Sequence, residues 1–520
     1  MRSALKQQID TFELHNNGMP SEIKQLTNLK NSSAVRSIDR LPGPRNWPLL
    51  GSLMKVKARR IHLDMEQWCH EYGPLFRVYL GRKLLLVVAR HTTVTTLLKH
   101  RPDGFRRPGI TAKVSAEAGG LPNVFMAEGT AWRNQRRMVM AGFAPKAIKA
   151  YYPALVNVGQ RLQRKWTQAA QHGIPIDVSA DLKRYTVDII AGLAFGQDVN
   201  TLEAGDNVIQ RHLDEILPAI ARRSLSPIPY WRYFKLPQDR RLEASSASLR
   251  AAVYALIDQA RARMRVHPQL ADKPNNLLEA LLAAADQPNS GINNDMVAGN
   301  VTTMLLAGED TTANTIAWLL YLLHTHPAAL AKATEELKQV ARFGDQLTLG
   351  NMDELVYLSA CIDEAMRLKP VAPFLPLEAL HDTLIEDVHV PAGTLVWCVM
   401  RRDSVDERYV VNPKSFEPER WMASTTNLLV SDDLLDKQVD ALPLDKRTSM
   451  PFGAGPRTCP GRYLALLEVK IAVAMVLRHF EIDSLSTPDG KAPQEMMAFV
   501  MSPVGLSMRL RLRSTPASEQ

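Results

Sequence analysis

Helical periodicity dominates the pattern of hydrophobic and polar positions along most of the chain. Apolar residues recur at intervals of three and four positions, a spacing that places them on one face of an α-helix. This pattern predicts helices near residues 131–165, 180–195, 207–222, 240–265, 293–325 and 328–341. No internal repeat or linker divides these helices, so we expect one large, mainly α domain with small β-sheets.

Strand patterns are short and confined to a few places. The segment "PLFRVYLGRKLLLVVA" alternates around a Gly-Arg turn, which predicts a β-hairpin. Further short strands are predicted in "LIEDVHVPAGTLVWCVM" and "VGLSMRLRLR". These strands predict small sheets that accompany the helices.

The N-terminal region differs from the rest of the chain. Residues 1–40 are polar and irregular, and we interpret them as a loosely held extension. The segment Leu41–Leu53 follows, and its prolines at positions 42, 44 and 48 exclude a regular helix there. We therefore expect the folded domain to occupy residues 41–520. The first forty residues contain no apolar core, so we expect no signal peptide and no transmembrane anchor.

One apolar stretch, "VTTMLLAGEDTTANTIAWLLYLL", is long enough to span a bilayer. Glu309 and Asp310 lie near its middle, and each acidic residue would cost roughly 2.5 to 3.5 kcal/mol on insertion scales. We therefore predict a buried core helix from about Asn293 to His326, stopped by Pro327. Polar groups at the centre of such a helix require an explanation.

Composition and charge narrow the class of protein. The chain has 520 residues, of which 46% are hydrophobic and 22% charged, as in ordinary globular proteins. Its net charge of +9 favours acidic partners, but the absence of zinc-finger spacing and of Lys/Arg-rich blocks disfavours nucleic acid. Four cysteines far apart, without a CxxC pair, fit a reducing compartment. We therefore expect a cytoplasmic protein.

The first candidate motif is "AGEDTT", in the middle of the predicted core helix. Gly308 weakens a helix by about 1 kcal/mol relative to alanine. The Thr311 hydroxyl can bond to the carbonyl of Ala307, four residues earlier. A glycine, an acid and a hydroxyl at this depth would form a groove with a proton donor. On this hexapeptide alone, a polar patch facing another helix is the more ordinary interpretation.

Two further motifs are weak when taken singly. Glu364 and Arg367 in "EAMR" share a helix face and can pair, and Arg420 in "FEPERW" offers a second guanidinium for the same carboxylate. Trp132 and Arg136 in "TAWRNQRR" lie four residues apart on another helix face. Each pattern is also typical of a solvated helix surface.

The segment "PFGAGPRTCPGRYLALLEVK" changes the interpretation of all of them. It fits the spacing F-x-x-G-x-R-x-C-x-G with Phe452, Gly455, Arg457, Cys459 and Gly461. This spacing resembles the haem-binding signature of the cytochrome P450 family. The other motifs occur in the family's order, and the resemblance extends from about Leu41 to the C-terminus. The missing anchor is typical of soluble bacterial-type members.

The resemblance implies the P450 fold, with haem (heme b, iron protoporphyrin IX) between the long central helix and the cysteine loop. Cys459 would be the axial ligand of the haem iron, as thiolate, and helix-start amides are expected to lower its pKa. Phe452 and Gly461 would also adjoin the cofactor, with Gly461 leaving room beside the sulfur. The residues expected to hold the haem propionates are Arg457, Trp132 and Arg136.

The central-helix motif then acquires a catalytic meaning. Asp310 and Thr311 match the family's acid–alcohol pair, which delivers protons during oxygen activation. Ala307 and Gly308 would border the oxygen pocket. Glu309 adds a second acid, which leaves open whether the two acids share the relay.

The resemblance also covers structural positions. The residues that match the family's buried triad, which shapes the cysteine loop, are Glu364, Arg367 and Arg420. One departure concerns Leu377, five residues before Asp382, where many members place an arginine for a propionate. Anchoring of the propionates is therefore expected to rest on Arg136 and Arg457.

The expected activity is insertion of one oxygen atom from O2 into a lipophilic small molecule, by hydroxylation or epoxidation. Contacts with substrate are expected from "GGLPNVFMAEG", "EILPAIARRSLSPIPYW", "VAPFLPL" and "AFVMSPVG". These stretches are apolar, which leaves fatty acid, terpenoid, steroid and polyketide substrates open. Two alternatives are a haem-thiolate isomerase or dehydratase and a non-catalytic haem sensor or carrier. The intact "EDTT" disfavours both.

Electrons are expected to come from a separate protein, a ferredoxin or flavodoxin with its reductase. No flavin or nicotinamide fingerprint is present, and the haem domain accounts for nearly the whole chain. A basic protein suits an acidic redox partner, because opposite charge raises association rates. The docking face is expected near Arg457 and the helix that carries Arg462 and Lys470. We expect a monomer.

Overall fold

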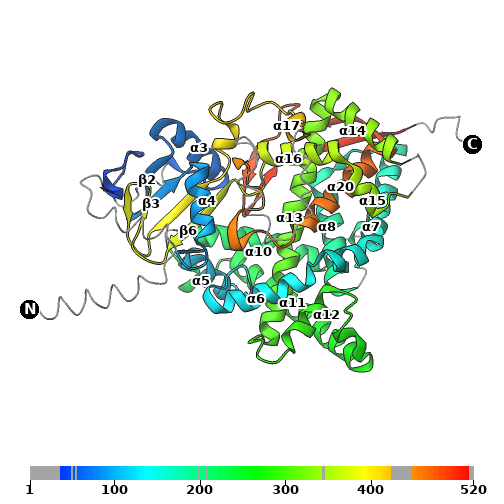
Figure 1. Cartoon of the computed structure of the whole chain (residues 1–520), viewed down its shortest axis with the longest axis horizontal. Helices are drawn as coiled ribbons and strands as arrows, with labels where there is room; N and C mark the ends of the chain where they lie inside the picture. Colours follow the sequence, from blue (N-terminus) through cyan, green and yellow to red (C-terminus); the bar gives the residue numbers. More distant parts are fainter. Residues whose placement is uncertain are drawn as a thin grey trace, which may run out of the picture.

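The computed structural model describes residues 35–513, except 49–50, 53–54, 197–198, 205–207, 227, 342–345 and 423–446. Helices make up most of it, and a smaller part rich in strands lies to one side (Figure 1). Most of the predicted N-terminal extension, residues 1–34, lies outside the described residues. The mainly α architecture with small sheets agrees with the sequence pattern.

The helices follow one another along the chain with short connections. In chain order they are α3 (Ile61–Tyr72), α4 (His91–Lys99), α5 (Gly109–Glu117), α6 (Gly129–Gly142), α7 (Pro145–Gln171), α8 (Val178–Phe195), α9 (Thr201–Ala204), α10 (Val208–Leu225), α11 (Pro237–Val266), α12 (Leu277–Ala285), α13 (Asn294–Thr325), α14 (Pro327–Val340), α15 (Leu349–Glu354), α16 (Val356–Leu368), α17 (Glu419–Met422) and α20 (Arg462–His479).

One helix expected from the sequence is in fact two. The region 131–165 contains most of α6 and most of α7, separated at Phe143 and Ala144. Ala144 is extended, with ψ of 140°, because the ring of Pro145 disfavours helical backbone at the preceding residue. The single helix predicted there is therefore wrong. The other predicted helices agree with the structure to within a few residues.

The strands form four small sheets. The largest has the order β2-β3-β9-β6-β4, and the others are β1-β8-β7, β10-β13-β5 and β11-β12. Their bounds are β1 (Arg36–Ser37), β2 (Leu75–Leu80), β3 (Lys83–Val88), β4 (Phe105–Arg106), β5 (Ile176–Asp177), β6 (Phe374–Ala379), β7 (Thr383–Ile385), β8 (Val388–Val390), β9 (Leu395–Val399), β10 (Phe480–Ser486), β11 (Glu495–Met497), β12 (Met501–Pro503) and β13 (Ser507–Leu512). The antiparallel pairing of β2 with β3 confirms the predicted hairpin.

The last residues of the predicted extension belong to the fold. Strand β1 pairs in parallel with β8. Its first residue, Arg36, donates from Nε and Nη2 to the Asp387 carboxylate over 2.6 and 2.8 Å. Ile38 is buried in the adjoining core. Residues 36–40 are therefore held in place, in contrast to the loose attachment expected for them.

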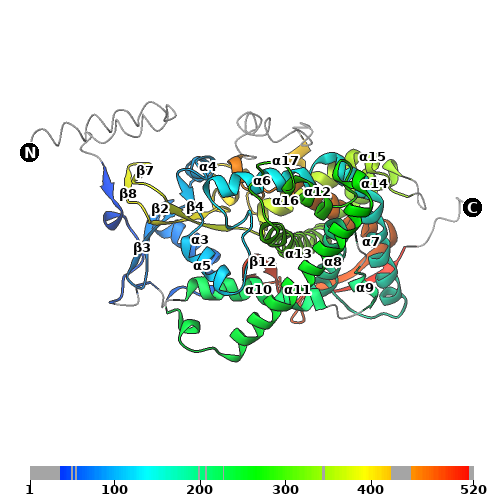
Figure 2. The same cartoon turned by 90° about the horizontal axis from the view of Figure 1, so that it is seen from below.

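Helix α13 is the centre of the helical part. Figure 2 looks nearly along this helix and shows other helices around it. The Asn293 side chain accepts from the Met296 amide at its start, and the helix ends before Pro327. Most of its residues are buried, which confirms a core helix. Among the described residues, no helix combines the length and apolar character needed to cross a membrane.

Candidate active site

Residues 451–461 form a tight loop that ends at the first turn of α20. Gly455 has a φ of +68°, a left-handed value that residues with a Cβ rarely adopt. A Cβ at this position would also lie 2.7 Å from the carbonyl oxygen of Leu98 in α4. Within the loop, the Cys459 amide donates to the Phe452 carbonyl over 3.0 Å. The glycine therefore allows the loop to lie directly against α4.

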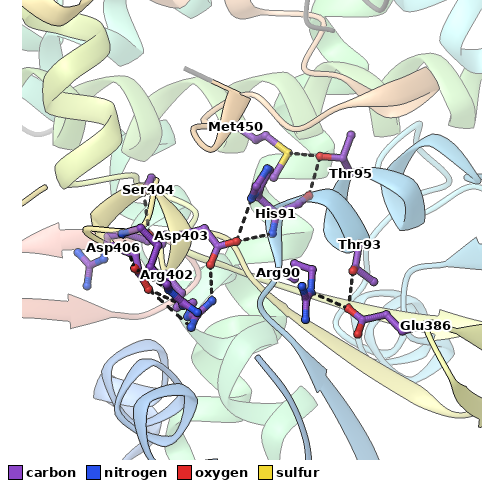
Figure 3. Close-up of polar contacts among 12 residues, drawn as sticks. Arg90, His91, Thr93, Thr95, Glu386, Arg402, Asp403, Ser404, Asp406 and Met450 are labelled. Carbon is purple, nitrogen blue, oxygen red and sulfur yellow. Dashed lines mark hydrogen bonds and ion pairs between the residues drawn. The ribbon is translucent and has the colours of Figure 1, made fainter. Parts of the chain in front are cut away.

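Figure 3 shows how the first residues of α4 are held in place. The His91 amide donates to Asp403 Oδ2 over 2.8 Å, and His91 Nδ1 lies 2.9 Å from the same oxygen. One turn later, Thr95 Oγ1 lies 3.2 Å from Met450 Sδ, at the start of the cysteine loop. Burial would raise the pKa of Asp403, but the bonds from His91 and the charge of Arg402 outweigh it and lower this pKa. The ionised Asp403 therefore holds α4 in place.

The Cys459 side chain is exposed, whereas the other three cysteines are buried. Burial nevertheless raises the pKa of its thiol, against the opposing effects of the Gly461 amide and of Arg136 and Arg462. The sulfur therefore faces a space that protein atoms largely enclose. The amide at the helix start lowers this pKa, as expected, but desolvation is the larger effect in the chain itself.

A cluster of buried arginines lies beside the cysteine loop. Arg457 Nη2 donates to the Ala127 carbonyl over 2.6 Å and pairs with Glu128. The Arg457 guanidinium also lies 4.8 Å from the centre of the Trp132 ring. The Arg107 amide donates to Glu128 Oε1 over 3.1 Å. Glu128 therefore joins the loop before α6 to the cysteine loop.

Positive charge exceeds negative charge in this cluster. Burial lowers the pKa values of Arg101, Arg107 and Arg457, the last to about 10, and only Glu128 opposes the effect in all three. Nε and Nη2 of Arg101 and Nε of Arg457 have no hydrogen-bond acceptor in the described part of the chain. Buried donors of this kind are normally satisfied, so the cluster suits a ligand that carries carboxylates.

The structure brings together the predicted propionate residues and adds others. Trp132 is buried on α6, and Arg136, one turn later, is close enough to affect the pKa values of both Cys459 and Arg457. Arg101 and Arg107 were missed, although the run "HRPDGFRRP" contains them and is unusually basic for a buried segment. Arg101 and Arg107 supply positive charge that the apolar side chain of Leu377, fully buried in β6, cannot supply.

The middle of α13 has the local geometry that its spacing predicts. Thr311 Oγ1 donates to the Ala307 carbonyl over 2.7 Å. Ala307 is exposed although most residues of α13 are buried. A Cβ on Gly308 would lie 3.2 Å from Ile190 Cγ1, so this glycine also allows α8 to pack closely. The packing role of Gly308 was not expected from the sequence.

The two neighbouring acids of α13 have different surroundings. Asp310 lines a cavity of about 590 Å³, and its Oδ1 lies 2.8 Å from Lys183 Nζ on α8. Glu309 is 2% exposed, and its backbone carbonyl accepts from the Thr186 hydroxyl over 3.0 Å. Only Asp310 of this pair lines that cavity, so it can exchange protons with water there.

A third carboxyl group beside α13 was missed. Glu468 on α20 is 3% exposed and is hydrogen-bonded to the Thr312 hydroxyl. Burial raises its pKa well above the ordinary value, which favours the neutral acid. The sequence signal is a glutamate within the otherwise apolar run "LALLEV".

The predicted ion pairs of Glu364 are present in the structure; the side chains of Glu364 and Arg367 are fully buried, and that of Arg420 is 9% exposed. Glu364 accepts from Arg367 Nη2 and Nε over 2.7 and 2.8 Å, and from Arg420 Nε over 3.0 Å. The Trp421 indole and the Glu417 amide add bonds of 2.8 and 3.0 Å. Burial would raise the pKa of Glu364, but these partners outweigh it and hold the pKa below the ordinary value.

Arg367 extends this network to the segment that follows β9. Its Nη1 donates to the carbonyls of Ser404 and Pro413 over 2.6 and 2.7 Å, and its Nη2 to that of Ser415 over 3.1 Å. Ser404 is adjacent to Asp403, which holds α4. The triad therefore reaches the cysteine loop through backbone and helix contacts.

Comparison with known proteins shows the family to which this site belongs. The family model described as Cytochrome P450 matches residues 41–510. The chain therefore belongs to the cytochrome P450 family, and this confirms an oxidoreductase of the monooxygenase class with a haem-thiolate site.

Individual relatives and solved structures agree with this assignment. "Self-sufficient cytochrome P450 monooxygenase CYP505AG1" of Oidiodendron maius is 27% identical over 91% of this chain, which spans 42% of that protein. "Protein LUTEIN DEFICIENT 5, chloroplastic" of Arabidopsis thaliana is 26% identical over 90% of this chain and 76% of its own length. The crystal structure of a cytochrome P450 (CYP102L1) has a TM-score of 0.73 and 26% identity, covering 91% of this chain and 99% of its own.

We predict that Glu364→Ala destabilises the protein by about 3 to 5 kcal/mol, because it leaves buried guanidinium groups without their carboxylate. Urea denaturation followed by tryptophan fluorescence measures the loss. Glu417→Ala is the matched control, since Glu417 pairs with Arg420 at the surface with a side chain 40% exposed. Its expected cost is about 0 to 1 kcal/mol. Equal effects of the two variants would contradict a buried structural role.

Glu364→Gln gives the pH dependence of the same interaction. The folded-state pKa of Glu364 is lowered from its ordinary 4.5, so its contribution to stability is complete above pH 4.5. That contribution is lost as the pH falls through the lowered folded-state pKa. The difference in unfolding free energy between wild type and Glu364→Gln should therefore shrink below pH 4.5. A difference that grew on acidification would contradict this sign.

Proposed function

We propose that the chain is a heme b monooxygenase that inserts one oxygen atom from O2 into a lipophilic small molecule. The observation that carries the proposal is the exposed thiol of Cys459 in a rigid loop beside a buried excess of arginines. The haem supplies the oxygen-activating chemistry. Cys459 would bind its iron, and a thiolate ligand favours O–O cleavage.

The orphaned donors of the arginine cluster would bind the haem propionates. Arg457 and Arg101 provide N–H groups without acceptors in the described residues, and Arg107 and Arg136 add positive charge. Trp132 packs beneath the Arg457 guanidinium and orients it. Two carboxylates would neutralise the charge excess that burial otherwise makes unfavourable. Phe452 and Gly461 would border the ring, and a Cβ on Gly461 would lie 3.9 Å from the Cys459 sulfur.

Proton supply is assigned to Asp310 and Thr311. Asp310 lines the cavity and is paired with Lys183, so it can take up protons there and release them toward the interior. The Thr311 hydroxyl, now donating to Ala307, would rotate to pass a proton from its Oγ. Glu309 is 2% exposed and does not line this cavity, so it is not included in this relay. A relay of this kind is unnecessary in an isomerase, a dehydratase or a haem carrier.

The proposed substrate class rests on the expected contact segments, which are mostly apolar. Two relatives are named for lipophilic compounds, a carotene epsilon-monooxygenase of Arabidopsis thaliana and a steroid 17-alpha-hydroxylase/17,20 lyase of Capra hircus. Hydroxylation and epoxidation are the reactions proposed. We place the enzyme in the cytoplasm as a monomer.

Electrons are proposed to come from a separate ferredoxin or flavodoxin with its reductase. The net charge of +9 supports association with an acidic partner. Arg133 and Arg137 are exposed on α6, the helix that carries Trp132, and they offer a basic docking surface. Lys470 lies on the helix expected near the docking face, but its Nζ donates to the Met352 carbonyl over 2.7 Å and burial lowers its pKa, so we do not include it in the docking surface.

The first test concerns Cys459. The reduced protein with carbon monoxide should show the strongly red-shifted Soret band of a thiolate ligand. Cys459→His should lose this band even where haem is retained, whereas Cys361→Ala, at a buried cysteine, should keep it. Persistence of the band in Cys459→Ala would show that the ligand is assigned wrongly.

The second test concerns the relay. Thr311→Ala should keep substrate binding and oxygen consumption but release hydrogen peroxide. The reason is that the Thr311 hydroxyl no longer directs the delivery of protons. Asp310→Asn should slow turnover by about 100-fold or more, as expected on loss of a general acid. Thr315→Ala is the control, since this hydroxyl bonds to the Thr311 carbonyl one turn away. Normal rate and coupling in Thr311→Ala and Asp310→Asn would favour an isomerase.

The third test concerns the redox partner. Reduction by a ferredoxin system should slow steeply between low salt and about 0.5 M, where screening falls to a few ångströms. Arg137→Glu should slow it at low salt and flatten the salt dependence. Lys491→Glu makes the same change of charge after β10, at a side chain 81% exposed, and should have little effect. Salt-independent reduction would exclude electrostatic docking.

A further inference from the structure

The base of the β11–β12 hairpin carries a carboxylate surrounded by cations. Glu495 Oε1 lies 2.6 Å from Lys369 Nζ and 2.9 Å from Arg401 Nη1. Its Oε2 lies 2.9 Å from Arg401 Nη2 and 3.0 Å from His62 Nε2. The partners come from α3, the end of α16 and the segment after β9. One side chain of the hairpin therefore joins separate parts of the chain.

The charges in this group are buried and balanced. The side chains of Glu495 and Arg401 are 9% and 6% exposed. Arg401 also pairs with Glu66 on α3, with N–O distances of 2.9 and 2.8 Å. Burial would raise the pKa of Glu495, but the bonds from His62 and Arg401 and the charge of Lys369 lower it far below the ordinary value. Glu495 is therefore ionised at neutral pH and cannot leave its partners without a large loss.

The hairpin continues from this anchor to an aromatic contact. Its register pairs Glu495 with Pro503 and Met497 with Met501, and the turn consists of residues 498–500. The Met501 amide donates to the Val371 carbonyl over 2.8 Å, two residues beyond Lys369. In the turn, Phe499 lies 5.8 Å from the Phe125 ring, measured between centroids. The anchor and the turn are thus rigidly connected over a few residues.

Phe125 is also in contact with the arginine cluster. The Arg107 guanidinium lies 3.2 Å from the centre of the Phe125 ring, and Arg107 Nε donates to the Phe125 carbonyl over 2.8 Å. The Phe125–Phe499 contact therefore joins the hairpin to the residues proposed to hold the cofactor. Residues 496, 498 and 500 of the hairpin also line the cavity that contains Asp310. The Phe499 end of the hairpin is therefore a wall beside the residues proposed to hold the cofactor, and the cavity at Asp310 borders other residues of the hairpin.

We propose that Glu495 is a positioning residue that sets this wall and thereby the size of ligand accepted at the haem. The inference rests on the proposed function, because it requires a ligand site at the iron. Glu495 acts through the hairpin, and the groups that touch the ligand are those of the turn, with Phe499 the main one. A bulky ligand packs on a wall that is already in place, whereas a small one does not use it. If the anchor is loosened, binding of the bulky ligand must also order the wall, which weakens its binding free energy.

Azole binding to the ferric holoprotein tests the proposal without knowledge of the substrate. Imidazole is the small probe and 4-phenylimidazole the bulky one, and each is titrated by the shift of the Soret band. Glu495→Gln should raise the Kd of 4-phenylimidazole by about five- to tenfold and that of imidazole by less than about twofold, since only the former uses the wall. Phe499→Ala should give the same selective loss with a wild-type melting temperature. The double variant should add little to either.

Glu66→Gln is the matched control, because it removes the other carboxylate of Arg401 without touching the hairpin. It should leave the ratio of the two Kd values unchanged. If Glu495→Gln yields no holoprotein, Lys369→Gln replaces it, since it removes one cation from Glu495 and should shift the ratio in the same direction. An unchanged ratio in the anchor variants, or an equal change in Glu66→Gln, would overturn the proposal. Wild type that gave no Soret shift with either azole would instead contradict the proposed haem enzyme.

Discussion

The buried ion pair between Glu364 and Arg367 is the interaction on which the cysteine loop depends. Neither side chain is exposed, so each charge must be satisfied inside the protein. Arg367 uses its remaining donors on backbone carbonyls, including that of Ser404. The next residue back, Asp403, binds His91 at the start of α4, and α4 contacts the loop through Thr95. A local charge pair thereby determines the position of a thiol far from it.

A second constraint is the charge balance around the proposed propionate site. Arg101, Arg107 and Arg457 lie in a poorly solvated region with Glu128 as their common acid. The chain alone cannot satisfy all their donors within the described residues. The buried excess of positive charge destabilises the protein without a ligand, and it would favour binding of a dianionic ligand. Stability and cofactor affinity are therefore linked through the same side chains.

Local features of the structure could be predicted from the sequence, because they depend on spacing along one element. The β2–β3 hairpin, the buried helix α13 and the Thr311–Ala307 bond are of this kind. The pairing of Glu364 with Arg420 was one possibility from the sequence alone, and the resemblance to the family favoured it. By contrast, Arg101 and Glu468 acquire their character only through burial by segments distant in the sequence.

The same reason explains what could not be weighed from the sequence at Cys459 and Lys470. The Cys459 amides do oppose a rise in pKa, as expected, but desolvation summed over many distant atoms outweighs them. Lys470 lies on the helix expected to carry the docking surface, yet it is turned toward the Met352 carbonyl. The break before α7 was readable in principle, because Pro145 marks it. Hydrophobic periodicity alone does not reveal a break between two helices when the second helix begins with a proline.

The contact between α4 and the cysteine loop also has a consequence for the order of folding. His91 and Asp403 are separated by 312 positions in the sequence, and Thr95 and Met450 by 355. Contacts between such distant residues form slowly, because the chain loses the entropy of closing a long loop before these contacts stabilise it. During synthesis, α4 leaves the ribosome long before its partners do. The thiol can therefore reach its final position only at the end of folding, when almost the whole chain has been made.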